Sequence, residues 1–456
     1  MSQIQDYIAS ESSRFEKDFF DFLRIPSIST IPAHKNDVHK AAEWLSELLK
    51  RIGLNPELIM TKRHPLVYAE TPKIEGAPTV MIYGHFDVQP VDPLDLWISP
   101  PFEPTIRNGS VFARGATDDK GQFLTHVFAV ESLLKTQKTL PFQIKMIFEG
   151  EEEDGSESIE EYVRENREKL DCDCLIVSDC AMFGPAQPAI TYGLRGIAAF
   201  ELFLTGPSRD LHSGVFGGSV YNPAIALSQM LAQLIDDKGR IQVHGFYDSV
   251  VPLSDRERKQ FADLPFDEKD YFDKINLKEG FGEEGYTTLE RRWTRPTFDI
   301  NGLTSGYQGD GSKTVLPSTA SAKITFRLVP KQEPHELHKN LEAFFRSICP
   351  PGITMKLEFQ HGSGGLLVSL ESPFVEAAEK AFKKTFPNPP VFTREGGSIP
   401  IIAYMSEVLN ADVLLIGWGQ DDDNLHAPNE KFSLASFHQG IQASTELLQE
   451  IANIKI

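Results

Sequence analysis

Three short apolar segments, each followed closely by polar or acidic residues, constrain the fold of this chain most. They are Pro78–Tyr83, Phe142–Phe148 and Cys174–Val177. Their continuous apolar character predicts buried strands, and the helical periodicity between them is typical of an α/β protein. His85, Asp87, Glu149 and Asp179 stand just after these segments. Because ligand sites of open α/β sheets lie at the carboxyl ends of strands, we expect these side chains at one edge of one sheet.

The alternation of helices and strands is interrupted in the middle of the chain. Helical spacing covers residues 4–23, 38–52, 121–135, 156–169, 373–386 and 433–451, and a strand is predicted at 412–416. The middle has longer strands at 197–205 and 320–329, helices at 223–235 and 334–347, and a charged, irregular surface segment at 255–293. We therefore predict an α/β domain with a mixed sheet flanked by helices, residues 1–193 plus 367–456, interrupted by an inserted α+β domain, residues 194–366.

The charge of the chain limits its partners. The formal net charge of −20 comes from 65 acidic and 45 basic residues, so the average surface repels phosphate backbones and nucleic acid is not an expected partner. No segment approaches the roughly 18 uncharged apolar residues of a membrane span. The first residues lack the basic and apolar regions of a secretion signal. We therefore expect a cytoplasmic protein with no membrane contact.

Three of the four cysteines, Cys172, Cys174 and Cys180, lie close together in the sequence. They allow either a thiolate metal site or a buried strand entering a core. The absence of a Cys-x-x-Cys pair and the apolar residues that follow Cys174 favour the strand.

Two short segments of the first half carry candidate metal ligands. His85 and Asp87 form a His-x-Asp pair at a strand end, which suits a ligand imidazole and a carboxylate that orients it, although a surface histidine beside an aspartate has the same pattern. Asp118 lies in the small-residue turn Gly115–Gly121 just before a predicted helix. This turn is either a helix N-cap or the position of a carboxylate that bridges two cations.

Two acidic segments add further candidates. The run Glu149–Ser156 places like charges at a strand end, where they form a solvated loop or are neutralised by cations. His426 lies in the second acidic segment, residues 421–430. Two imidazoles and three or more carboxylates at one sheet edge match a mixed N/O site for zinc or manganese better than a site for magnesium.

These motifs together resemble the M20 metallopeptidases, especially the cytosolic non-specific dipeptidase and carnosinase branch, over nearly the whole chain. The His-x-Asp-x-x-Pro motif falls on His85, Asp87 and Pro90, the Gly-x-x-Asp-x-Lys-Gly motif on Gly115, Asp118, Lys120 and Gly121, and the Glu-Gly-x-Glu-Glu-x-Gly-Ser motif on residues 149–156. Glu151 stands where the family usually has an uncharged residue. The resemblance implies a catalytic α/β domain and an inserted lid or dimerisation domain.

The resemblance also implies two divalent ions, Zn²⁺ or Mn²⁺, per subunit. His85 and Asp179 would hold one ion, Glu153 and His426 the other, and Asp118 would bridge them. Asp87 would orient His85, Glu152 would be the general base, and the Asp118–Asp119 peptide bond would be cis.

For the substrate, the resemblance implies groups in the second half of the chain. His212 would reach the partner's active site in a homodimer and stabilise the oxyanion, and Arg327 would bind the substrate carboxylate. Thr314 and the Gly397-Ser398 backbone would help Arg327, and Glu395 would receive the substrate ammonium.

The function that follows is a hydrolase of small peptides. A metal-bridged hydroxide, with Glu152 as base, would cut the bond beside a free C-terminal carboxylate, as in a dipeptidase or carboxypeptidase. An N-acyl amino acid deacylase with the same metal centre is the alternative, and a non-catalytic metal-dependent peptide-binding protein is a third interpretation.

Overall fold

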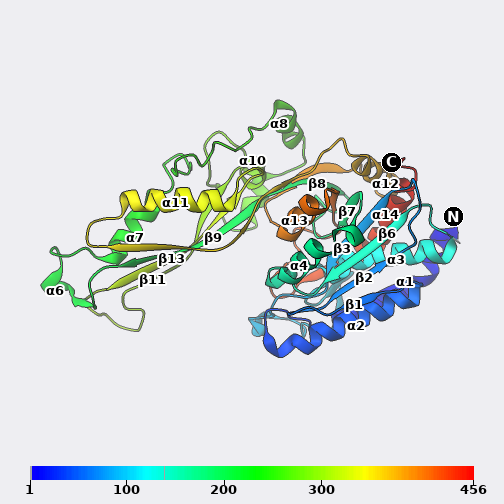
Figure 1. Cartoon of the computed structure of the whole chain (residues 1–456), viewed down its shortest axis with the longest axis horizontal. Helices are drawn as coiled ribbons and strands as arrows, with labels where there is room; N and C mark the ends of the chain where they lie inside the picture. Colours follow the sequence, from blue (N-terminus) through cyan, green and yellow to red (C-terminus); the bar gives the residue numbers. More distant parts are fainter. Residues whose placement is uncertain (1–2, 138, 456) are drawn as a thin grey trace. The chain divides into compact units, whose positions relative to one another are not determined.

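The computed structural model describes residues 3–137 and 139–455 and contains two compact units (Figure 1). The first unit comprises Met1–Tyr192, Val368–Thr393 and Tyr404–Ile456, and the second comprises Gly193–Leu367 and Arg394–Ala403. Residues 394–403, which the sequence analysis placed in the α/β domain, therefore cluster with the second unit. The reason is local contact: Arg195 donates hydrogen bonds to the carbonyl oxygens of Gly396 and Gly397.

The first unit is built on a mixed sheet with the strand order β1-β2-β6-β3-β7-β17-β8. Strands β6, β3, β7 and β17 run parallel to one another, whereas β2 is antiparallel to β6 and β8 is antiparallel to β17. The strands of this unit are β1 (Glu57–Ile59), β2 (Leu66–Glu70), β3 (Thr79–His85), β4 (Thr105–Arg107), β5 (Ser110–Phe112), β6 (Gln143–Glu149), β7 (Cys174–Val177), β17 (Asp412–Ile416) and β18 (Lys431–Ser433), while β8 (Ala189–Leu194) and β16 (Val391–Glu395) cross its boundary. The expected α/β class with a mixed sheet is confirmed.

Helices bury this sheet. They are α1 (Gln3–Leu23), η1 (Pro32–His34), α2 (Lys35–Ile52), η2 (Leu94–Leu96), α3 (Lys120–Thr136), η3 (Glu152–Asp154), α4 (Glu157–Glu165), α5 (Arg167–Leu170), α12 (Pro373–Thr385), α13 (Pro400–Leu409, across the boundary) and α14 (Leu434–Ile451). Helix α3 contacts α1, α14 and β3 and is buried on nearly every side, as its largely apolar sequence requires. Helix α2 ends at Gly53, whose φ of 113° is the left-handed conformation that glycine adopts readily.

One predicted helix is broken. The sequence analysis expected a single helix over residues 156–169, but the structure has α4 and α5 separated at Asn166. Asn166 has a non-helical backbone, and its side chain donates a hydrogen bond to Tyr162 O, 2.9 Å away. Asparagine competes with helical hydrogen bonding in this way, and periodicity alone does not register it.

The cysteines behave as core residues. Cys172, Cys174 and Cys180 are buried and free, and Cys174 begins β7, as the strand interpretation predicts. Among the described residues, the groups of side chains able to hold a metal contain no cysteine.

The second unit is an antiparallel sheet covered by two helices. The strand order is β11-β13-β9-β14, and β10 pairs with β12. Its elements are β9 (Gly196–Thr205), β10 (Leu211–His212), α6 (Ser213–Phe216), α7 (Pro223–Ala232), α8 (Asp255–Ala262), α9 (Glu268–Asp273), α10 (Thr288–Thr294), β11 (Thr297–Ser305), β12 (Val315–Leu316), β13 (Thr319–Leu328), α11 (Pro334–Ile348), β14 (Thr354–Ser363) and β15 (Leu366–Leu367). Helices α7 and α11 share one apolar core with the sheet (Figure 1). The other face carries polar side chains, including Arg327.

The charged segment 255–293 is more ordered than the sequence suggested. It forms α8, α9 and most of α10, and it buries Phe261 and Trp293 against each other. Glu283 forms a two-pronged ion pair with Arg295, and both side chains are more than nine-tenths buried. Most of the segment is exposed, as expected of a surface segment, but its helices were not expected, and charge content alone does not reveal which charges are paired and buried.

Over the described part of the chain, no helix is both long enough and apolar enough to cross a membrane.

Candidate metal centre

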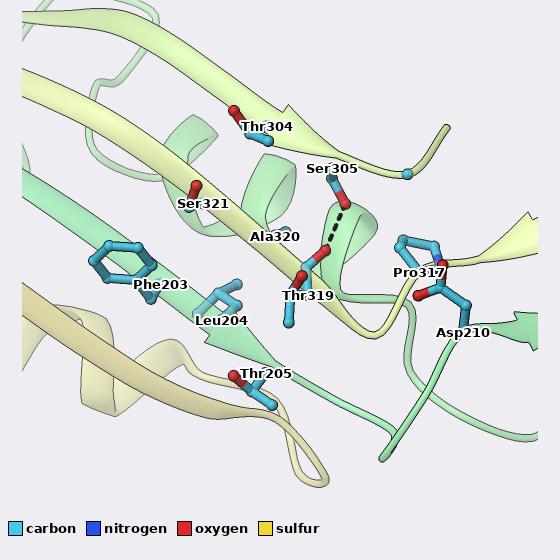
Figure 2. A pocket seen from close by; sticks show the side chains of 11 residues that line it. Phe203, Leu204, Thr205, Asp210, Thr304, Ser305, Pro317, Thr319, Ala320 and Ser321 are labelled. Atoms are coloured by element: carbon cyan, nitrogen blue, oxygen red, sulfur yellow. Dashed lines mark hydrogen bonds between the residues drawn. The ribbon is translucent and has the colours of Figure 1, made fainter. Parts of the chain in front are cut away.

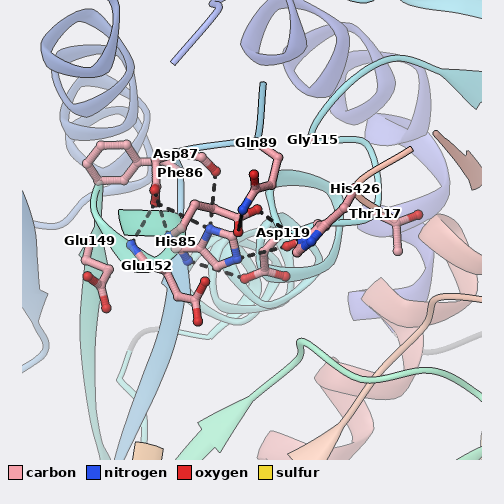
Figure 3. A network of polar contacts seen from close by, with 12 residues as sticks. His85, Phe86, Asp87, Gln89, Gly115, Thr117, Asp119, Glu149, Glu152 and His426 are labelled. Atoms are coloured by element: carbon pink, nitrogen blue, oxygen red, sulfur yellow. Dashed lines mark hydrogen bonds and ion pairs between the residues drawn. The ribbon is translucent and has the colours of Figure 1, made fainter. Parts of the chain in front are cut away.

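The candidate site lies where three parallel strands of the first unit end. His85 is the last residue of β3 and pairs with Glu149, the last residue of the neighbouring β6. Asp179 follows two residues after the end of β7. This placement follows from the parallel register, which brings carboxyl ends together. Figure 3 shows the polar side chains that converge there.

Two groups of potential metal ligands share one carboxylate. The first group is His85, Asp118 and Asp179, and the second is Asp118, Glu153 and His426. Within each group, one ligand atom per residue lies within 4.8 Å of the others. The five residues come from segments far apart in the sequence, and the fold brings all of them together.

His85 is held by Asp87 on one side and faces Asp118 on the other. Its Nδ1 lies 3.2 Å from the Asp87 carbonyl oxygen and 3.4 Å from the Asp87 carboxylate, and its Nε2 lies 3.1 Å from Asp118 Oδ1. Burial lowers the pKa of His85, but the Asp118 and Asp87 carboxylates outweigh it and raise the pKa well above its usual value. Asp87 also accepts the backbone N–H groups of Glu152 and Glu153, so it joins β3 to the glutamate run.

Asp118 lies between the two imidazoles. Its Oδ2 is 2.8 Å from His426 Nε2, and the Asp118–Asp119 peptide bond is cis, as the resemblance implied. Burial opposes ionisation of Asp118, but the hydrogen bonds with His426 and His85 hold its pKa below the usual value. Burial and the nearby Asp179 raise the pKa of Asp119 well above its usual value, and Asp119 Oδ2 accepts the His85 backbone N–H.

The glutamate run divides into structural and site residues. Glu149 accepts hydrogen bonds from the Tyr83 hydroxyl at 2.7 Å and the Ser156 hydroxyl at 2.9 Å. Glu151 is fully buried and pairs with Arg63 at 3.3 Å. Glu152 and Glu153 remain for the site, which supports the motif register despite the third glutamate.

The two site glutamates have raised pKa values for the same main reason. Burial raises the pKa of Glu152 to about 7 and that of Glu153 to about 10, and the negative charge of Asp118 adds to both. Crowded carboxylates in a buried site are costly unless cations neutralise them.

The residues fit a pair of divalent cations. His85 Nε2 and Glu153 Oε1 are buried without a well-oriented hydrogen bond, and each faces another candidate ligand, Asp118 Oδ1 at 3.1 Å and His426 Nε2 at 3.5 Å. The ligand set combines imidazole nitrogen with carboxylate oxygen, and Asp118 has one oxygen toward each group. Such a mixed set suits zinc or manganese.

Two residues at this site escaped the sequence analysis. Gln89 donates a hydrogen bond of 2.6 Å to Glu153 Oε2, which leaves Oε1 of Glu153 toward His426 at 3.5 Å. Glu430, four residues after His426, is fully buried beside the turn that carries Asp118. Both lie in segments already quoted, but only tertiary contact shows what they touch.

His212 and Thr314 lie together in the second unit. His212 ends β10 and Thr314 directly precedes β12, and the Ser213 N–H donates to Thr314 O at 3.2 Å. His212 is exposed, and its Nδ1 accepts the backbone N–H of Gly214 at 3.0 Å. Because Nδ1 is an acceptor, neutral His212 carries its proton on Nε2 and presents a hydrogen-bond donor there.

Arg327 forms a second group in this unit. Its guanidinium donates to Ser398 Oγ at 3.1 Å, and Gly397 adjoins Ser398. Arg195, which the sequence analysis did not select, is held by Gly396 O at 3.0 Å. Burial and, to a lesser extent, the nearby positive charge of Arg327 lower the pKa of Arg195 to about 10. Two arginines beside one loop make this part of the unit attractive to an anion.

Glu395 and one polar hollow of the second unit carry less of the argument. Glu395 is the last residue of β16, next to the Gly396-Gly397-Ser398 loop. A hollow of about 370 Å³ lies at the ends of β9, β11 and β13 (Figure 2). Its hydroxyl side chains and Asp210 form no group of three metal ligands among the described residues.

Known proteins resemble this chain over nearly its whole length. A profile of peptidase family M20/M25/M40 matches residues 81–450. The Cys-Gly metallodipeptidase dug1 of Schizosaccharomyces pombe is 31% identical, over 100% of this chain and 99% of that protein.

Two solved structures extend the similarity to the whole fold. Human carnosine dipeptidase 1 has a TM-score of 0.86 and 28% identity, and the match covers 100% of both chains. The M20 family metallo-carboxypeptidase Sso-CP2 of Sulfolobus solfataricus has a TM-score of 0.85 and 33% identity, over 96% of this chain and 99% of that one.

Proposed function

The chain belongs to peptidase family M20/M25/M40 and is a metallopeptidase, and we propose that it hydrolyses dipeptides at the bond beside a free C-terminal carboxylate. The observation that carries this proposal is the pair of ligand groups that share Asp118. A shared carboxylate suits two adjacent cations. The similar metallodipeptidases support the choice of a small peptide substrate.

His85 and Asp179 would hold one cation, Glu153 and His426 the other, and Asp118 would bridge them. Bound there, Zn²⁺ or Mn²⁺ would acidify water and polarise the scissile carbonyl. Asp87 and Gln89 would orient two of the ligands, since they contact His85 and Glu153 directly.

Glu152 would be the general base. It has no assigned metal, and burial places its pKa at about 7, near the pH at which a base is most effective. Glu152 would take a proton from the attacking water and return it to the leaving amine. The adjacent Asp87, which accepts the Glu152 backbone N–H at 3.2 Å, would keep the base in place.

His212 would bind the oxyanion that forms at the scissile carbonyl, and Arg327 would bind the substrate carboxylate. His212 Nε2–H would donate to the oxyanion, since the Gly214 N–H holds Nδ1 as an acceptor. Arg327, with Thr314, Ser398 and Gly397, would bind the substrate carboxylate, for which a planar fork is well suited. Glu395 would receive the free ammonium of a dipeptide.

His212 would act on the partner's site in a homodimer. The surface after His212 supports this proposal, because Val215 and Ile225 are 69% and 53% exposed, and Ile225 lines a hollow of about 470 Å³ together with other apolar and small side chains. A second copy of the chain would cover this surface. A cytoplasmic location remains part of the same proposal.

The testing experiment is hydrolysis of Cys-Gly, Ala-Ala, β-Ala-His and N-acetyl-alanine by metal-stripped protein, with zinc or manganese added back. Cleavage of free dipeptides that returns only with metal would support the proposal and identify the preferred ion. Cleavage of the acetylated substrate alone would replace it with a deacylase, and silence across the panel would favour a non-catalytic peptide-binding protein.

A further inference from the structure

Glu430 has an unusual environment for a residue outside the proposed ligand set. It is fully buried, and both of its carboxylate oxygens are saturated with donors. Oε2 accepts Arg114 Nη1–H at 2.8 Å and Gly115 N–H at 3.0 Å. Oε1 accepts Thr117 N–H at 3.0 Å and Asp118 N–H at 3.1 Å.

The three backbone donors belong to the turn that presents Asp118. Buried backbone N–H groups need partners, and successive N–H groups that point inward form an anion-binding concavity. Here the anion is a side chain of the same protein. Glu430 thereby fixes the peptide of Asp118, the carboxylate common to both ligand groups.

Arg114 extends this contact to a third segment. Its side chain is 1% exposed, and its second Nη group donates to Pro90 O at 2.9 Å. Pro90 ends the segment that begins at His85, and Glu430 ends the segment that begins at His426. One ion pair therefore joins the three segments that carry His85, Asp118 and His426.

A purely structural role would predict something different. Buried ion pairs contribute little net stability compared with well-packed apolar residues, so stability alone is a weak explanation for this one. The acceptor is needed locally instead, because the three backbone N–H groups of the Asp118 turn have Glu430 as their partner.

We propose that Glu430 is a positioning residue for the metal centre, which sets cation affinity by holding the Asp118 turn and, through Arg114, the His85 segment. The proposal rests on the dinuclear centre proposed above. Glu430 makes no contact with substrate in this role, so turnover by fully metal-loaded enzyme depends on it only weakly.

The test is Glu430→Gln in the full chain. Glutamine has the same shape as glutamate, but its NH₂ group is a donor. It would face either the Arg114 and Gly115 donors at one oxygen or the Thr117 and Asp118 donors at the other. Zinc and manganese affinities are measured by competition with a chromogenic chelator, which needs no enzyme activity. We expect about 10- to 100-fold weaker binding, the range seen when groups that orient metal ligands are removed.

The matched control is Glu283→Gln. Glu283 forms a pair with Arg295 at 2.7 and 2.9 Å that is also more than nine-tenths buried, but in the second unit. The Glu283→Gln substitution should lower thermal stability and leave cation affinity unchanged. Equal affinity in the wild type and E430Q would overturn the proposal, and so would an equal loss in E430Q and E283Q, since general destabilisation would then be the cause.

A second variant keeps the test decisive if E430Q does not fold. Arg114→Lys retains the positive charge beside Glu430 but loses the planar fork that also reaches Pro90 O. Weaker cation binding by R114K supports the proposal, and wild-type binding overturns it. Wild-type protein that binds both metals but cleaves no dipeptide would refute the proposed function alone, because the affinity comparison would still stand.

Discussion

At the scale of single residues, neighbouring glutamates of one run have separate tasks. Glu151 pairs with Arg63, whereas Glu152 and Glu153 lie at the candidate metal centre with raised pKa values. Sequence adjacency therefore does not imply shared chemistry. The chemical difference lies in what each carboxylate contacts.

Glu152→Gln should reduce the turnover rate by about 10²- to 10⁴-fold, while zinc or manganese content stays at the wild-type level. The amide keeps the shape of the side chain but cannot accept a proton. Turnover and metal content are measured on the same preparation. Glu151→Gln is the matched control and should retain activity within a few fold, because Glu151 faces Arg63. Retained turnover in E152Q would refute its role as base.

His126 gives a pH-dependent prediction away from the ligands. Its Nε2 lies 2.6 Å from Ser178 Oγ, and burial lowers its pKa from 6.5 to about 3. Below about pH 6.5 the unfolded chain binds a proton at this residue that the folded protein does not bind. The contribution of neutral His126 to the free energy of unfolding is therefore fully present above about pH 6.5 and is lost as the pH falls toward 3.

In His126→Gln this pH dependence should disappear. Between pH 7 and pH 4.5 the wild type should lose about 2–3 kcal/mol of unfolding free energy relative to the variant. Urea unfolding of both proteins at several pH values measures the difference. The substitution also changes the unfolding free energy at pH 7, so only the dependence on pH is compared. If the unfolding free energies of the two proteins changed with pH in parallel, the lowered pKa of His126 would be contradicted.

At the scale of elements, helix α3 supports the turn before it. The helix begins at Lys120, directly after the cis Asp118–Asp119 bond, and its Lys120 side chain donates to Ile25 O at 2.8 Å. Burial lowers the pKa of Lys120 to about 7. The first turn of α3 is thus packed as tightly as the core, which keeps Asp118 at a defined position.

Gly121→Ala tests this packing. A methyl group at residue 121 would collide with Ala116 O and lie 2.7 Å from Phe432 and 2.9 Å from Phe19. We expect a loss of about 3 kcal/mol of stability and weaker metal binding, measured by thermal unfolding and chelator competition. Gly184→Ala, with nothing within 4 Å of the new methyl group, should change stability by less than about 1 kcal/mol. Similar behaviour of both variants would contradict the tight packing.

At the scale of the whole molecule, the proposed reaction divides its groups between the units. The metal ligands and Glu152 belong to the first unit, and His212, Thr314 and Arg327 belong to the second. A homodimer in which His212 acts on the partner's site makes a specific prediction about mixed dimers.

Refolding an equal mixture of inactive Glu152→Gln and His212→Ala chains should restore about one quarter of wild-type activity. Half of the dimers would be mixed, and one of their two sites would combine an intact Glu152 with the partner's intact His212. Each variant refolded alone is the control. If His212 acted within its own chain, no site would be complete and the mixture would stay inactive.

Local pattern was sufficient for much of this protein. Buried strands such as Cys174–Val177 follow from continuous apolar residues, and the polar residues after them predict a site at the strand ends. The spacing of the motifs and their resemblance to a family gave the candidate ligands. The strand and helix inferences succeed because strand direction and helix periodicity are short-range properties of the chain.

Tertiary structure alone decided the contacts across the sequence. Glu430 holds Asp118 from 312 residues away, Gln89 binds Glu153, and Glu283 neutralises Arg295 in a segment whose charge suggested solvent. A buried charge or amide is stable only beside its partner, and no local pattern states which distant donor will be that partner.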